Sequence, residues 1–137
     1  MDRPPVVVIV GRQRAHEVLL LAMSVIIGVA YIIGGPPPRS LAALLHPAVF
    51  KGWAVLMLIT GAAGLVGCLY RGRVETALGI ERGAMTAQFG ALLIYATVLF
   101  AYAGMSALLA GLITAGWAAA DLARAVQISR DLRRLRP

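Results

Sequence analysis

The chain has 137 residues, of which 60% are hydrophobic and only 14% are charged, and its mean hydropathy is +0.82. Soluble globular chains carry about 25% charged residues, so this composition excludes an ordinary soluble domain and indicates an integral membrane protein. The net charge of +7 does not indicate a nucleic-acid partner, because the arginines lie at the ends of apolar runs and not in an aromatic-rich soluble module.

The N-terminal arm, residues 1–16, precedes the first long apolar run and contains the β-branched stretch Val6–Val10. This stretch is too short to cross a membrane, and it has no obvious partner strand in the chain. Two interpretations stay open. The arm is interfacial or disordered, or it adds a strand to another protein or to another copy of the chain.

Four apolar runs follow and predict an all-α membrane protein with a four-helix transmembrane domain over residues 17–126. They cover about residues 17–33, 49–70, 84–102 and 105–126, and each is long enough to cross a hydrocarbon core about 30 Å thick. Backbone hydrogen bonds in lipid must be satisfied within each segment, so we expect helices. The short link Tyr102–Ser106 predicts an antiparallel hairpin with Gly104 at the turn.

A proline-rich segment ends the first run, because Pro36, Pro37 and Pro38 cannot continue a helix. The stretch Ser40–Pro47 after it predicts one or two helical turns, with Ser40 as the N-cap. We expect this short helix to lie at the outer surface of the membrane.

Charge bias predicts the orientation in the membrane. One side collects eleven arginines, namely Arg3, Arg12, Arg14, Arg71, Arg73, Arg82, Arg124, Arg130, Arg133, Arg134 and Arg136. The other side has Arg39 and Lys51. The positive-inside rule therefore places both termini and the central loop in the cytoplasm, in a bacterial inner membrane. The expected interfacial aromatic residues are Tyr31, Trp53, Tyr70 and Tyr102.

The tail, residues 127–137, continues the fourth run as a basic amphipathic helix. Its expected apolar face contains Ala125, Ile128, Leu132 and Leu135, and the arginines opposite are Arg130, Arg133 and Arg134, with Arg136 beyond. Contact with anionic lipid headgroups is favoured over a specific protein ligand.

Catalytic and metal-binding constellations are not evident in the sequence. His16 and His46 lie on opposite sides of the predicted membrane, so no Ser/His/Asp set can assemble within one subunit. The single Cys68 excludes an internal disulfide and a cysteine-based metal site, and a buried thiol is favoured over a lipidated one. We therefore expect a protein without enzymatic activity and without a cofactor.

Acidic residues near the membrane are the usual indication of transport, because their burial is costly. The candidate ion-pair or switch residues are Glu17, Arg71, Arg73, Glu81, Asp121 and Arg124. Glu17 and Asp121 lie near the ends of their runs, each three residues from an arginine, which favours structural end charges. Glu81 lies just outside its apolar run and is expected to pair with Arg71, Arg73 or an arginine of another chain.

Small residues recur at helical spacing on three of the predicted helices. The stripes are Gly61, Gly64 and Gly67; Gly79, Gly83, Ala87 and Ala91; and Ala107, Gly111 and Ala115. Such stripes let helix backbones approach closely, either within a subunit or between copies, and the sequence leaves both open. The polar residues expected to join helices by hydrogen bonds are Thr60, Gln88, Thr97 and Thr114.

The stretch GWAVLMLITGAAGLVGCLYRGRVETALGIERGAM and the apolar run after it, roughly residues 52–104, resemble small four-helix membrane proteins of actinobacterial phages. The shared pattern is a Trp near the start of a Gly-rich helix, a short Arg/Gly loop, and Glu-Arg-Gly before the next apolar run. Such proteins are mostly unassigned and some are regarded as holin-like. The resemblance implies a phage or prophage origin and assigns no catalytic residue.

The leading interpretation is a self-associating membrane protein that permeabilises the inner membrane in a holin-like way. One alternative is a membrane subunit or scaffold that docks another protein through Val6–Val10 or the basic tail. Another is a small transporter or channel built around Glu17, Glu81 or Asp121.

Overall fold

The computed structural model of the chain describes residues 14–134, and the regular elements in this range are helical. They are α1 (Arg14–Ile32), α2 (Arg39–Leu44), α3 (Pro47–Leu69), α4 (Val74–Ala103), η1 (Gly104–Ala107) and α5 (Leu108–Arg134). The β-branched stretch Val6–Val10 of the arm and the last residues of the basic tail lie outside the described residues.

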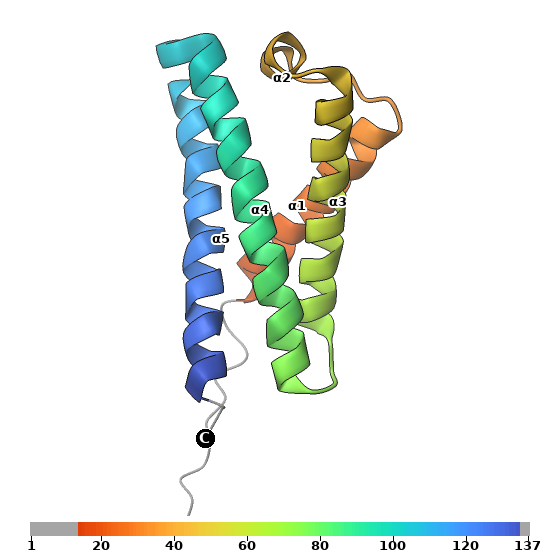
Figure 1. Cartoon of the computed structure of the whole chain (residues 1–137), viewed down its shortest axis with the longest axis vertical. Helices are drawn as coiled ribbons and strands as arrows, with labels where there is room; N and C mark the ends of the chain where they lie inside the picture. The colour runs from red at the N-terminus through yellow and green to blue at the C-terminus, as the bar shows by residue number, and fades with distance from the viewer. Residues whose placement is uncertain (1–13, 135–137) are drawn as a thin grey trace, which may run out of the picture.

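The four long helices predicted from the apolar runs are confirmed. Three helical stretches are long and apolar enough to cross a membrane, namely Ala15–Ile32, Pro47–Leu69 and Val74–Arg133. The third stretch contains both α4 and α5, which fold back on each other at η1 and pack side by side (Figure 1). This arrangement is compatible with a multi-pass membrane protein.

The hairpin turn lies at the glycine that the sequence predicts. Gly104 is the C-cap of α4 and has a φ of 51°, a backbone conformation that favours glycine because it has no Cβ. At its other end α4 begins at Val74, well before its apolar run, so the segment Val74–Met85 is helical as well.

The short helix α2 differs from the prediction in its N-cap. Its N-cap is Pro38, whose extended backbone follows from the fixed φ of proline, so the expectation that Ser40 caps this helix is wrong. Ser40 and Leu41 are buried, and α2 packs against α3 and α4. The apolar side chain of Leu41 therefore joins the core, while Ala42, Ala43 and Leu44 stay exposed. The expected position of α2 at the outer surface of the membrane stays a prediction.

The long helices pack in the order α1, α3, α4 and α5, with α1 behind α3 in Figure 1. Glycines bring the neighbours close together. A Cβ built on Gly61 would lie 2.8 Å from the Leu21 carbonyl oxygen of α1, and one on Gly67 would lie 2.8 Å from the Glu81 backbone nitrogen of α4. A Cβ on Gly111 of α5 would meet the ring of Phe100 in α4. These two stripes therefore pack within the subunit.

An aromatic cluster, defined here as Tyr31, Phe50, Trp53 and Tyr95, fills the end of the bundle near α2. Trp53 is only 8% exposed, and its indole Nε1 donates a hydrogen bond of 3.0 Å to the Ala91 carbonyl oxygen. The expectation that Trp53 anchors the chain at the membrane interface is therefore wrong, because its polar N–H finds its partner inside the bundle.

The polar residues expected to join helices divide into two groups. Gln88 of α4 does so, since its Nε2 donates to the Ser24 Oγ of α1 at 2.9 Å. Thr60, Thr97 and Thr114 instead donate to backbone carbonyls four residues earlier in their own helices. Their interhelical role is not borne out, because a threonine hydroxyl reaches the carbonyl of its own helix more readily.

Candidate functional site

The helices around the site carry polar or charged residues on the faces that pack against one another. In α5 the buried residues recur every three or four positions and are Gly111, Thr114, Ala118, Asp121, Ala125 and Ile128. This spacing is that of helices packed against neighbours, so Asp121 occupies a core position. The same spacing places Glu17 on the face of α1 that carries the buried Leu21. It places Glu81 on the face of α4 that carries the buried Met85.

These residues meet at the terminal end of the bundle, defined here as the end where α1 begins and α5 ends. We call Glu17, Glu81, Asp121 and Arg124 the charged cluster. Arg124 is its centre: its Nη2 and Nε lie 2.7 and 2.8 Å from the Glu81 Oε1, and its Nε lies 3.2 Å from the Glu17 Oε1. Glu81 is 1% exposed, so a fully buried carboxylate faces a guanidinium from another helix.

The sequence predicted the residues of this cluster but not their partners. Glu81 pairs with Arg124 of the same chain, whereas Arg71 and Arg73, its expected partners, are exposed in the loop between α3 and α4. The reason is that Glu81 lies on the buried face of α4, where Arg124 of α5 reaches it. Arg124 likewise turns toward Glu17 and Glu81 of other helices and not toward Asp121 of its own helix.

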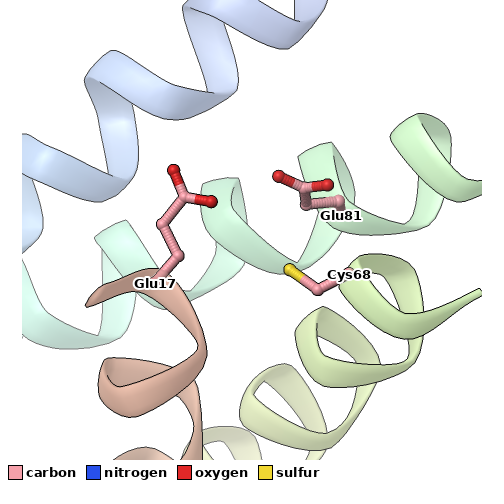
Figure 2. Close-up of side chains that lie close together, drawn as sticks. All are labelled: Glu17, Cys68 and Glu81. Carbon is pink, nitrogen blue, oxygen red and sulfur yellow. The ribbon is translucent and has the colours of Figure 1, made fainter. Parts of the chain in front are cut away.

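Cys68 of α3 completes the surroundings of the two glutamates. Figure 2 shows Glu17, Cys68 and Glu81 pointing toward one another from three different helices, and their ligand atoms lie within 4.8 Å of one another. The thiol is buried, as the sequence predicts. Two carboxylates and a thiol resemble a metal-binding set, but the Arg124 guanidinium already contacts both carboxylates. We therefore interpret the group as an ion-pair network and assign no metal to it.

Beside the ion pairs lies a cavity of about 480 Å³ between α1 and α5. It is lined by Ala15, His16, Glu17, Leu20, Met85, Ala120, Asp121 and Arg124. Asp121 is 4% exposed, and its Oδ2 is buried without a hydrogen-bond partner among residues 14–134 that the structure describes. The sequence interpreted Asp121 as an end charge, whereas the structure places it in the wall of a cavity.

A second cavity, of about 130 Å³, lies nearer to α2 and is bordered by α1, α3, α4 and α5. Its walls include Tyr31, Trp53, Tyr95 and Trp117. The indole Nε1 of Trp117 is buried without a hydrogen-bond partner. Trp117 lies one helical turn from Asp121 on α5, so the two cavities share one side of the bundle.

Most of the small residues predicted on α4 lie on the side of that helix opposite to the buried Glu81 and Gln88. Gly79, Gly83 and Ala87 are exposed, and a Cβ added to Gly79, Gly83 or Gly90 would meet open space. Ala91, the fourth predicted member, is 1% exposed and belongs to the core. At about 100° per residue, Ala91 lies about 120° around the helix from Gly79, whereas Gly90 lies within about 20° of it.

Other predicted residues have simpler positions. Arg130 and Arg133 are exposed on α5 while Ile128 is buried, so the described part of the tail is amphipathic. The side chain of Arg134 and the whole of Arg136 lie outside the described residues. Ala107 and Ala115 are half-buried on the side of Gly111.

Sequence reasoning missed Ser24 and the cavity-lining His16, Leu20 and Met85. The spacing of Ser24 could have indicated its burial. Glu17, Leu21, Ser24 and Gly28 follow one another at intervals of three or four residues, which places them on one face of α1. The chain matches no protein-family model, no curated protein and no solved structure.

Proposed function

We propose that the chain is a small, non-enzymatic protein of the bacterial inner membrane that associates with other copies of itself. Both termini would lie in the cytoplasm, in keeping with the eleven arginines on that side. The observation that carries the proposal is the exposed small-residue stripe of α4, defined here as Gly79, Gly83, Ala87 and Gly90.

This stripe differs from the two others because its glycines have no close neighbour among the described residues of the subunit. The glycines of α3 contact α1 and α4, and Gly111 contacts α4. In contrast, Gly79 and Gly83 face away from the buried Glu81 and Gln88, and nothing lies near the position of their missing side chains. Helices in lipid associate through such small residues, because close backbone approach gains dispersion contacts that lipid cannot supply as well.

A holin-like role follows as the functional part of the proposal. Copies would accumulate in the membrane, pack through the α4 stripe, and open a lesion once enough of them have assembled. The resemblance of residues 52–104 to small phage membrane proteins supports this role, as does the preponderance of apolar side chains on the outer surface.

Self-association is tested by a matched pair of substitutions in the purified full chain. Gly83→Leu places a branched side chain in the stripe, and Gly116→Leu places the same side chain at an exposed position of α5 where a Cβ also meets open space. We expect Gly83→Leu to raise the dissociation constant of the assembly at least tenfold, which is about 1.4 kcal/mol, and Gly116→Leu to leave it unchanged. Light scattering of the detergent-solubilised protein measures both, and equal effects would contradict the α4 interface.

Permeabilisation is tested separately, by inducing expression in bacteria and following the membrane potential with a dye. The holin-like role predicts that the potential collapses at a defined time and that Gly83→Leu delays the collapse, because assembly would limit the rate. High expression of the parent chain without loss of potential would contradict the holin-like role. It would leave self-association to be judged by light scattering.

A further inference from the structure

We propose that the cavity between α1 and α5 binds a small organic cation, an ammonium group carried on an apolar body. The site lies on the other side of the bundle from the α4 stripe, so the proposal is independent of self-association. It is carried by the charge balance around the cavity, by the unpartnered Asp121, and by the apolar and aromatic surfaces next to it.

The charges around the cavity do not balance. Among the described residues, three carboxylates, those of Glu17, Glu81 and Asp121, gather around one guanidinium, that of Arg124. Arg124 contacts Glu81 at 2.7 Å and Glu17 at 3.2 Å, so its charge is engaged by two of the three. Among the described residues that line the cavity, Arg124 and the exposed imidazole of His16 are the basic groups. The site therefore has room for a further positive charge next to Asp121.

Asp121 is the residue that points to a ligand. It is 96% buried, it lines the cavity, and its Oδ2 has no hydrogen-bond donor within the described part of the chain. A buried carboxylate oxygen without a donor loses its hydration and gains nothing in return. An ammonium in the cavity would donate hydrogen bonds to it and compensate its charge at the same time.

The size and walls of the cavity favour an organic cation over a metal ion. A volume of about 480 Å³ lies in the range of pockets for small molecules, about 300–1,000 Å³. Much of the wall is apolar, because Leu20 of α1 and Met85 of α4 border it together with Ala120 of α5. A divalent ion would require several more oxygen ligands than these walls offer, whereas an apolar body would cover them.

The neighbouring cavity supports the same class of ligand. It is lined by four aromatic rings, including Trp117, which lies one turn from Asp121. The faces of tryptophan and tyrosine rings attract cations. The side of the bundle between α1 and α5 thus carries carboxylates at one end and aromatic faces at the other, and both attract a cation with an apolar body.

An ammonium of this kind has two sources, a free amine or the ammonium headgroup of a phospholipid. The chemistry that recognises them is the same, namely carboxylates beside an apolar wall. Lipid composition therefore forms one arm of the test.

The test uses the purified full chain in a non-ionic detergent and calorimetric titration with three probes of one shape. These are phenethylammonium, the neutral phenethyl alcohol, and the anion 3-phenylpropionate. We expect saturable binding of phenethylammonium alone. Asp121→Asn, which keeps the size of the side chain and removes its charge, should weaken this binding at least tenfold. Asp131→Asn on the same helix, outside the cavity lining, should change it less than twofold.

A second variant keeps the test decisive if Asp121→Asn does not fold. Ala120→Phe fills the cavity from an exposed position of α5 without altering a charge, and it should also weaken binding at least tenfold. The proposal is overturned if the three probes bind alike, if none binds, or if binding survives in whichever of the two variants folds. In nanodiscs of phosphatidylglycerol, added phosphatidylethanolamine that competes with the probe identifies the lipid headgroup as the source. Unchanged probe affinity identifies a free amine.

Discussion

One guanidinium joins three helices at the terminal end of the bundle. Arg124 of α5 contacts Glu17 of α1 and Glu81 of α4 through a single group, at 3.2 and 2.7 Å. Removing one partner of a buried ion pair leaves an uncompensated charge, which costs more than the pair itself contributes. The free energy of unfolding should therefore depend more on Arg124 than on either glutamate.

The first prediction is that Arg124→Gln lowers the free energy of unfolding by about 3–5 kcal/mol, because it removes the cation that faces the buried carboxylate of Glu81. Glu81→Gln should cost less, since the amide still accepts a hydrogen bond and Arg124 retains Glu17. Unfolding by SDS from mixed micelles, followed by circular dichroism, measures both.

Arg130→Gln is the matched control for that prediction, because Arg130 is an exposed arginine on the same helix. It should change the free energy of unfolding by no more than about 0.5 kcal/mol. If Arg124→Gln behaves like Arg130→Gln, the ion-pair network does not stabilise the fold.

The sequence could predict that Glu81 needs a partner but could not identify it. Arg124 is 43 residues away, and its position depends on how α5 packs against α4. The nearby Arg71 and Arg73 were attractive partners because they are close in sequence. Periodicity offered a better guide, since Glu81 shares a helical face with Met85 and Gln88, which are buried. Asp121 could have been placed in the core in the same way.

At the scale of elements, α3 is the helix that has close neighbours on two sides. Gly61 and Gly64 face α1, where a Cβ would meet Leu21, and Gly67 faces the backbone of Glu81 in α4. Backbone atoms cannot move aside as the end of a flexible side chain can. Gly67 therefore fixes the separation of α3 and α4 beside the charged cluster.

The second prediction is that Gly67→Ala lowers the free energy of unfolding by about 1–3 kcal/mol, because the added methyl forces α3 away from α4. Gly79→Ala is the control: its Cβ meets open space, so better helix propensity should stabilise the subunit by about 1 kcal/mol. The same SDS titration measures both at a protein concentration where the chain is monomeric. Equal stability of the two variants would show that Gly67 is not a close-packing position.

The helices also show which features of the fold can be predicted from sequence patterns. Hydropathy predicted the four long helices, and Gly104 was predicted at the hairpin turn because a five-residue link allows little else. Three small-residue stripes were equally visible in the sequence. Two of them pack within the subunit and one is exposed, and this difference depends on the helix neighbours, which hydropathy does not specify.

At the scale of the whole molecule, four long helices return the chain to the end where it began. The contact of Glu17 in α1 with Arg124 in α5 shows that the start of α1 lies beside the second half of α5. The loop with Arg71 and Arg73 joins α3 and α4, and Leu44 of α2 precedes α3 on its other side. The loop between α3 and α4 and the short helix α2 therefore lie at opposite ends of α3, which is long enough to cross a membrane.

The third prediction concerns the orientation of this bundle in the membrane. Because translocation of arginine-rich ends is disfavoured, Leu44→Cys should react with a membrane-impermeant maleimide in intact spheroplasts, and Glu75→Cys should react only after lysis. Both native side chains are exposed, so the introduced thiols are accessible to the reagent. The parent chain is the control, since its Cys68 is 6% exposed and should stay unmodified. If only Glu75→Cys is labelled in intact spheroplasts, the bundle has the opposite orientation in the membrane. Equal labelling of both variants would instead indicate insertion in two orientations, and either result would contradict the proposed cytoplasmic termini.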